Sequence, residues 1–311
     1  MTEIERGTLH ELALKYAIKQ PHEVDEITEE APILKCIKWE KASHGLWNVA
    51  QKTTNIDGAD FVKMNAALPK MQVDSKLEKV DLSIMGGEMF VPEDTAQQFG
   101  GHAKYFASKM PKLLKDAGCA TEKRIIYDNF RQYAIDNGTA KTAGATADDV
   151  QKGIYSMLIV RFIPGEVCGL YSPEGFATGA MLNATPINGG QLYKDEKGVL
   201  GYGVRLKGYF GIQMLNSKAV SAIVNISDGK LPTKRQINSA LIDARANKAN
   251  TKIFLHPTLL SWLGEEYKTD ILRVSNTDNG INTQINYWNE IEMISSYNFL
   301  NGTETIATLK E

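Results

Sequence analysis

The chain has 311 residues, of which 43% are hydrophobic, so it can form a globular core and has the length of about two ordinary domains. Its 35 basic and 37 acidic residues give a formal net charge of -2. This balance excludes the class of strongly basic proteins that bind nucleic acid tightly. Cys36, Cys119 and Cys168 are far apart, which argues against a zinc site or a disulfide framework. The sequence has no signal-peptide pattern and no apolar run of about 18 residues, so we expect no membrane span.

The first third of the chain carries apolar residues without a pattern that would bury them. Only 8–18 has a helical period, with Leu9, Leu12, Ala13 and Tyr16 on one face. Extended runs at 39–49 and 80–91 then flank a polar tract, which predicts a long projecting loop of hairpin character. Because such a segment lacks its own core, we expect it to be buried against other copies or other chains.

Four residues of this region are candidates for interface contacts: Trp39, Trp47, Leu68 and Met71. Tryptophan is favoured as a buried anchor between partners, but packing of Trp39 and Trp47 within one subunit is an equal alternative. The methionines of the region resemble an adaptable contact surface, although methionine more often fills a core.

Two helices are predicted next. The run 94–117 keeps a helical spacing of apolar residues, should bend at Gly100–Gly101 and at Pro111, and can be closed by Gly118. A second helix runs from Thr121 to Asn137.

The remainder alternates between strands and helices and predicts an α+β fold. Strands are predicted at 155–162, 166–171, 203–214, 222–226 and 252–256, and runs of strand character at 287–297 and 303–308. Helices are predicted at 233–249, where Thr233 and Gln236 fit a capping box, and at 258–263.

The motifs of common enzymes are missing. The sequence has no phosphate loop, no dinucleotide-binding glycine pattern, no nucleophile elbow and no zinc-binding His-Glu-x-x-His helix. Cys168 and His256 could act as a nucleophile and a base, but an inert buried thiol and a satisfied histidine at a strand end are the better interpretation. We therefore expect no catalytic residue, no cofactor and no metal.

The order of several short phrases along nearly the whole chain resembles the major capsid proteins of tailed bacteriophages, which have the Hong Kong 97-type fold. The matching phrases are Thr8 to Leu14, Ala31 to Leu34, Ala67 to Pro69, Tyr155 to Phe162, Gly169 to Gly175, Ala222 to Ile226, Trp288 to Met293 and Asn301 to Thr305. The resemblance implies an N-terminal arm at residues 1–38 and an extended β-hairpin loop at 39–92. It further implies a peripheral domain with a long spine helix at 93–162 and 283–311, and an axial domain at 163–282.

The resemblance also implies a function. The chain would be a structural subunit that self-assembles into the pentamers and hexamers of an icosahedral phage head. Its partners would be copies of itself, portal and scaffolding proteins, and packaged double-stranded DNA contacted without sequence specificity, with no membrane involved. It would be located in the capsid shell of the virion, after assembly in the host cytoplasm.

Two alternatives stay open. A cellular nanocompartment shell protein would share the fold and enclose enzymes in place of DNA. A soluble enzyme with an unrecognised site is the weaker alternative, because it would need a pocket with convergent polar groups.

Overall fold

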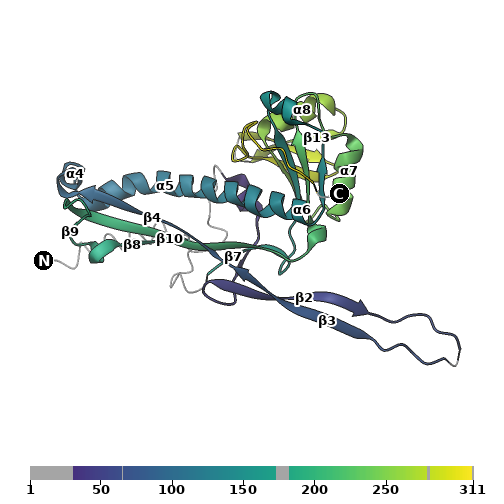
Figure 1. Ribbon diagram of the computed structural model, residues 1–311. Coiled ribbons are helices and arrows are strands. Elements are labelled where there is room, and N and C mark those ends of the chain that lie inside the picture. Colours follow the sequence, from purple (N-terminus) through teal and green to yellow (C-terminus); the bar gives the residue numbers. More distant parts are fainter. Residues whose placement is uncertain (1–30, 65, 173–181, 279–280, 310–311) are drawn as a thin grey trace.

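The computed structural model describes residues 31–309 except 65, 173–181 and 279–280. Figure 1 shows three parts: a layered body, an elongated part in which the long helix α5 (His102–Arg124) lies along a sheet, and a hairpin that projects from the junction of the two. The helix predicted for 8–18 falls outside the described residues. The body and the elongated part bury their apolar residues in their own cores, whereas the hairpin leaves most of its apolar residues exposed.

The body is built on a seven-stranded sheet with the order β13-β14-β15-β12-β6-β11-β5. Its strands are β5 (Ala140–Thr142), β6 (Tyr155–Arg161), β11 (Val220–Ile226), β12 (Thr251–Leu255), β13 (Ile271–Asp278), β14 (Ile281–Trp288) and β15 (Ile291–Ser295). Strand β6 lies between β11 and β12 and runs antiparallel to both. The strands predicted at 155–162, 222–226 and 252–256 are confirmed.

Helical segments cover both faces of this sheet. Helices α7 (Lys234–Asp243) and α8 (Pro257–Glu266) lie on one face, and α3 (Pro32–Cys36) and the π-helical segment η1 (Ile125–Arg131) lie on the other. Successive residues of a strand point to opposite faces, so Ile159 packs towards α7 while Leu158 packs towards η1. Burial on both faces explains why β6 is an almost uninterrupted apolar run.

The elongated part is a six-stranded sheet with α5 packed along it. The strands are β1 (Trp39–Lys41), β4 (Ser83–Pro92), β7 (Val167–Tyr171), β8 (Leu182–Pro186), β9 (Tyr193–Lys194) and the long β10 (Leu200–Met214). Strand β10 is the centre of the sheet, because it pairs with β4, β7, β8 and β9. Phe106, Met110 and Leu114 of α5 are buried against Val91 and Val204 of the sheet.

The helical region differs from the prediction at both ends. Gly100 and Gly101 have φ angles of +78° and +115°, and this left-handed backbone separates the short α4 (Glu93–Gln98) from α5. The predicted end at Gly118 is wrong: Gly118 is buried inside α5, and the helix continues through η1 and α6 (Gln132–Asp136). The two predicted helices therefore form one continuous element, because the buried stripe passes through Gly118 without a break.

Three predictions for the C-terminal third also need correction. Helix α7 starts at the predicted capping box of Thr233 and Gln236 but ends at Asp243, before Arg245 turns into the left-handed region at φ +47°. The run predicted at 287–297 is broken by Asn289 and Glu290, whose positive φ angles make the tight turn of the β14–β15 hairpin. The segment 303–308 forms no strand and makes only one isolated bridge, at Thr303.

The predicted domain boundaries do not match the two sheets. Strands β6, β14 and β15, predicted to be peripheral, lie in the seven-stranded sheet with β11, β12 and β13, while β7 to β10, predicted to be axial, lie in the sheet beneath α5. Residues 31–38 of the predicted arm are anchored in the body core, and β1 and β4 of the predicted loop belong to the six-stranded sheet. Boundaries drawn along the chain fail here because the strands pair across long sequence separations.

Candidate assembly surfaces

The projecting hairpin consists of β2 (Trp47–Asp57) and β3 (Gln72–Asp81), which pair only with each other. Their register and the alternation of side chains divide the hairpin into two faces, with a register shift between Thr53 and Asn55. The apolar face carries Trp47, Val49, Ile56, Val73 and Leu77. The polar face carries Lys52, Asn55, Asp74, Lys76 and Glu78. A two-stranded hairpin is marginal alone in water, so this apolar face needs a partner.

Exposed apolar side chains continue from that face to the tip of the hairpin. Ile56, Val73 and Leu77 are 66%, 64% and 70% exposed. At the tip, two of the predicted interface residues, Leu68 and Met71, are strongly exposed, and Phe61 and Met64 even more so. Polar residues of the same face, Gln51, Thr53 and Ser75, lie between these apolar side chains. Several large exposed apolar side chains on one projecting element are typical of a protein–protein contact.

The predicted interface residue Trp47 lies at the base of the hairpin. Its ring stacks on His44 at a centroid distance of 3.6 Å, and the Lys79 ammonium lies 5.5 Å from its ring centroid. The side chain is half-buried. Trp47 is therefore held in a fixed orientation while part of its ring remains open to a partner.

Trp39 packs inside the subunit. Its indole Nε1 donates a hydrogen bond to the Leu34 carbonyl at 3.3 Å, and its ring meets Phe210 edge-on. The ring lies so close to Gly169 that a Cβ at Gly169 would come within 2.5 Å of it, so only glycine fits there. The two sequence-predicted tryptophans thus have different surroundings, and Trp39 ties α3 to the six-stranded sheet.

A buried carboxylate, not singled out by the sequence analysis, anchors α3 to α5. Glu122 is fully buried and accepts hydrogen bonds from the backbone N–H groups of Ile33 and Leu34, at 2.9 and 3.3 Å. Its other oxygen accepts from the Ser296 hydroxyl and from the Asn298 amide. Burial raises the pKa of this carboxyl above its ordinary value. Four donors from two separate segments thus meet on one side chain of α5.

A second buried cluster fastens the C-terminal segment to η1. Glu304 accepts hydrogen bonds from Tyr127 at 2.9 Å and from Ser156 at 2.5 Å, and it lies 3.6 Å from the Arg131 guanidinium. The side-chain amide of Asn225 binds both the N–H and the C=O of Ala307. Side chains therefore replace the strand pairing that was predicted for 303–308.

The two residues considered for nucleophilic chemistry do not meet. Cys168 is buried in β7 of the six-stranded sheet, and burial next to Glu40 raises the pKa of its thiol to about 12. His256 follows β12 in the other sheet, and its Nδ1 accepts a hydrogen bond from the N–H of Thr258 as the N-cap of α8. The Cys168 side chain packs within its sheet and the His256 side chain caps a helix. The thiol would also be a poor nucleophile at neutral pH.

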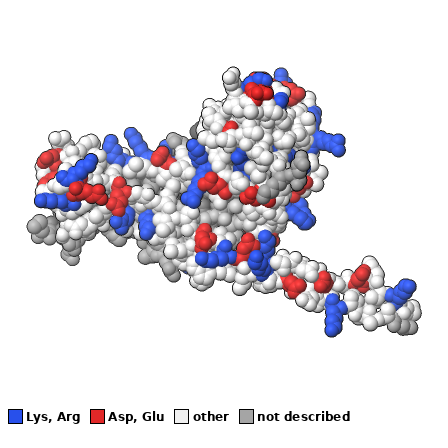
Figure 2. Space-filling view, viewed as in Figure 1, with Lys and Arg blue, Asp and Glu red and all other residues white. Residues whose placement is uncertain are grey.

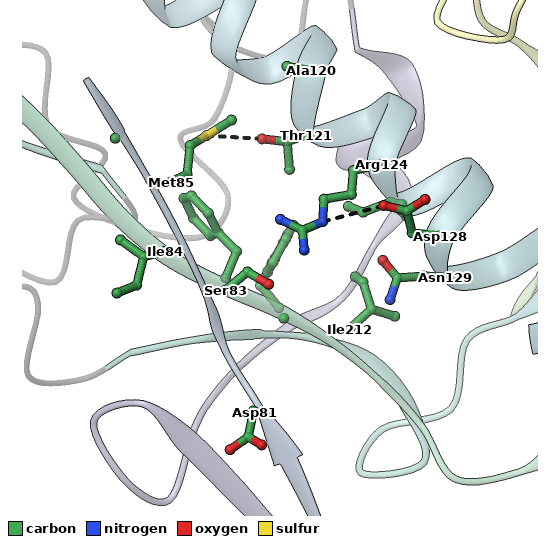
Figure 3. Close-up of a pocket in the computed structure, with 15 residues that line it drawn as sticks. Asp81, Ser83, Ile84, Met85, Ala120, Thr121, Arg124, Asp128, Asn129 and Ile212 are labelled. Carbon is green, nitrogen blue, oxygen red and sulfur yellow. Dashed lines mark hydrogen bonds and ion pairs between the residues drawn. The ribbon is translucent and has the colours of Figure 1, made fainter. Parts of the chain in front are cut away.

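A pocket of about 570 Å³ lies between the end of α5 and the strands β4 and β10 (Figure 3). Its walls are largely apolar and include Met85, Ile125 and Ile212. The Arg124–Asp128 ion pair crosses its helical side at 3.6 Å, and both side chains are mostly exposed. The lining holds no histidine, cysteine or glutamate, and its polar residues include Asp81, Ser83 and Thr121.

Two general features of the described residues concern membranes and metals. No helix in the described ranges is long and apolar enough to cross a membrane. Within the same ranges, no three His, Cys, Asp or Glu side chains are grouped so that they could hold a metal ion.

Comparison with known proteins identifies the fold. No protein-family model matches the chain, and no curated protein matches its sequence. Among solved structures, that of bacteriophage Epsilon15 matches with a TM-score of 0.56 and 14% identity over 88% of each chain. The bacteriophage JBD30 capsid also matches with a TM-score of 0.56, at 8% identity over 88% of this chain and 92% of that one.

A third match is weaker. The SrpI encapsulin of Synechococcus elongatus PCC 7942 covers 67% of this chain and 91% of its own, at 13% identity and a TM-score of 0.46, which is too low to support an argument. At the identities of the two phage structures the likeness shows the fold alone. The chain therefore has the α+β, Hong Kong 97-type fold that the sequence resemblance implies.

Proposed function

We propose that the chain is the major capsid protein of a tailed bacteriophage, a structural subunit that assembles into an icosahedral head around double-stranded DNA. The observation that carries the proposal is the hairpin β2–β3, whose apolar face and tip are exposed in a subunit that is otherwise well packed. The fold shared with the JBD30 capsid supports the same conclusion. In this proposal each hairpin is covered by another copy of the chain.

The details of assembly belong to the proposal as well. Pentamers and hexamers would form the shell, portal and scaffolding proteins would take part in its assembly, and the shell would be located in the virion. The division into peripheral and axial domains is proposed with new boundaries: the sheet beneath α5 as the peripheral domain and the seven-stranded sheet as the axial domain. Leu68, Met71 and Trp47 are the interface residues that we retain.

Electron microscopy with light scattering tests the proposal on the purified full chain, expressed with and without its neighbouring genes. We expect closed shells or rings of five and six copies. A compact monomer under every condition would contradict the proposal and would reopen the search for an enzyme site. Shells that hold an enzyme, from a gene beside that enzyme's gene, would identify the nanocompartment alternative.

A pair of double variants tests the contribution of the hairpin. Leu68→Ser with Met71→Ser removes two exposed apolar side chains from the tip, and we expect it to abolish or strongly reduce shell yield. Ile242→Ser with Leu272→Ser removes two exposed apolar side chains from the body and serves as the matched control. Equal shell yield from both double variants would show that the tip makes no assembly contact.

A further inference from the structure

The exposed side of α5 carries a row of lysines. They are Lys104, Lys109, Lys112, Lys115 and Lys123. At 3.6 residues per turn they fall within an arc of about 140°, and at 1.5 Å per residue the row extends about 29 Å along the helix. Figure 2 shows blue side chains at intervals along the part of the molecule where Figure 1 places α5.

Little negative charge balances this row. Asp116 is the one exposed acidic residue of α5 on the same arc. Glu122 falls at the edge of this arc but is buried, so it adds no surface charge. In the described part of the chain, no carboxylate lies within ion-pair distance of Lys104, Lys109, Lys112 or Lys123. A chain with a net charge of -2 thus concentrates positive charge on one face of its longest helix.

The shape of this face limits which partner it can bind. Phe106, Met110 and Leu114 of α5 are buried against the sheet, and Leu113 is 43% exposed. One partly exposed leucine is not the broad apolar face that a membrane-surface helix inserts. A row of ammonium groups on flexible stems gives no shaped pocket for a small anion. It matches a polymer with a regular repeat of negative charge, such as the phosphate backbone of nucleic acid.

We propose that the lysine face of α5 contacts the phosphates of the packaged duplex DNA and therefore forms part of the inner surface of the shell. The inference rests on the proposed function for the presence of DNA beside the chain. The contacts are to phosphates and carry no base specificity. The rest of the chain has a net negative charge, which keeps the binding of one subunit weak. In a shell, the weak contacts of many copies add together.

The first experiment measures binding of the full chain to a 30-base-pair duplex as the salt concentration is varied. In one variant Lys104, Lys109, Lys112 and Lys123 are replaced by Gln, which has a similar helix propensity. In the control variant four exposed lysines outside α5, namely Lys194, Lys197, Lys218 and Lys268, are replaced by Gln. Both variants have the same net charge, and circular dichroism checks that both are folded.

The slope of log K against log salt concentration is negative, and we expect it to be less steep in the α5 variant by up to about 3.6. The reason is that each phosphate contact contributes about 0.9 to the magnitude of the slope. The control variant should keep the wild-type slope. Equal slopes for both variants, or no measurable duplex binding by the wild type at low salt, would overturn the inference.

A second measurement separates this inference from the proposed function. In shells, the reactivity of lysine amines towards a small acylating reagent is compared before and after the DNA is removed. We expect Lys104, Lys109, Lys112 and Lys123 to react more slowly when DNA is present, and the four control lysines to react equally. Shells in which the α5 lysines show no protection would refute the inference while the capsid function stands, whereas failure to form shells would refute the function itself.

Discussion

The body and the hairpin of this protein use the same kinds of side chains in opposite ways. In β6 and β11 nearly every side chain is buried, because helices cover both faces of the seven-stranded sheet. In β2 and β3 the apolar residues Ile56, Val73 and Leu77 of one face are left open to solvent. From this contrast we expect the body to be stable in a lone subunit and the hairpin to gain its apolar burial in an assembly.

The largest effect on subunit stability is expected from the body core. Phe254→Ala removes a fully buried ring of β12 and should lower the free energy of unfolding by about 3 to 5 kcal/mol. Phe61→Ala removes the same side chain from the fully exposed hairpin tip and should change it by less than about 0.5 kcal/mol. Urea unfolding of the unassembled chain measures the unfolding free energy of both variants. Equal losses of free energy would contradict the contrast between the body core and the hairpin.

The anchor between α3 and α5 should make stability depend on pH. Because the folded-state pKa of Glu122 is raised, its favourable contribution is present in full below the unfolded pKa of about 4.3 and is lost as the pH rises through the folded pKa. The stability of the wild type relative to Glu122→Gln should therefore fall as the pH rises, by at most about 1.4 kcal/mol per pH unit.

Denaturant unfolding at pH values from about 4 to about 8 measures the difference in unfolding free energy between the wild type and Glu122→Gln. Asp116→Asn, which removes an exposed carboxylate from the same helix, is the control. A stability difference for Glu122→Gln that rises with pH would contradict the raised pKa.

A smaller effect is expected at the start of α7. The Thr233 hydroxyl accepts a hydrogen bond from the backbone N–H of Gln236, so Thr233→Ala should cost about 1 kcal/mol of unfolding free energy. Thr269→Ala removes an exposed hydroxyl that has no capping role and should be close to neutral. Thermal unfolding compares the two, and an unchanged midpoint for Thr233→Ala would show that the cap contributes nothing.

The smallest effect on the lone subunit is expected at the hairpin base. Trp47→Ala should lower the free energy of unfolding by less than about 1 kcal/mol but should reduce shell yield, because the hairpin loses an anchor and the body loses no core residue. Trp39→Ala, the matched control, should destabilise the subunit clearly more, because that ring packs on Gly169 and Phe210. Normal shells from Trp47→Ala would remove this tryptophan from the interface.

Local patterns in the sequence were sufficient for most individual elements. The spacing of Phe106, Met110 and Leu114 predicts the buried stripe of α5, and Thr233 with Gln236 predicts the start of α7. The sequence also predicts that the hairpin region has no core of its own. These features depend on neighbours a few residues apart, so a single stretch of sequence contains the whole cause.

The outcome for the candidate interface residues was divided. The exposure of Leu68 and Met71 agrees with their place in a projecting loop without a core of its own, but nothing local distinguishes Trp39 from Trp47. The difference arises because Trp39 is paired with Gly169 in the neighbouring strand β7, whereas Trp47 pairs with Asp81 in the hairpin. Glu122 was not predicted at all, since its partners Ile33 and Ser296 are distant in sequence.

The sequence by itself determined many of the helices and strands and which apolar residues cannot be buried locally. The tertiary structure alone decided that β6 lies between β11 and β12, that β10 joins β4 to β7, and that each sheet takes strands from both sides of the predicted boundaries. The physical reason is that strand pairing and buried polar contacts are made between residues brought together only by folding. The energies of these contacts depend on residues far apart in the sequence. Ile33 and Glu122, for example, are 89 positions apart.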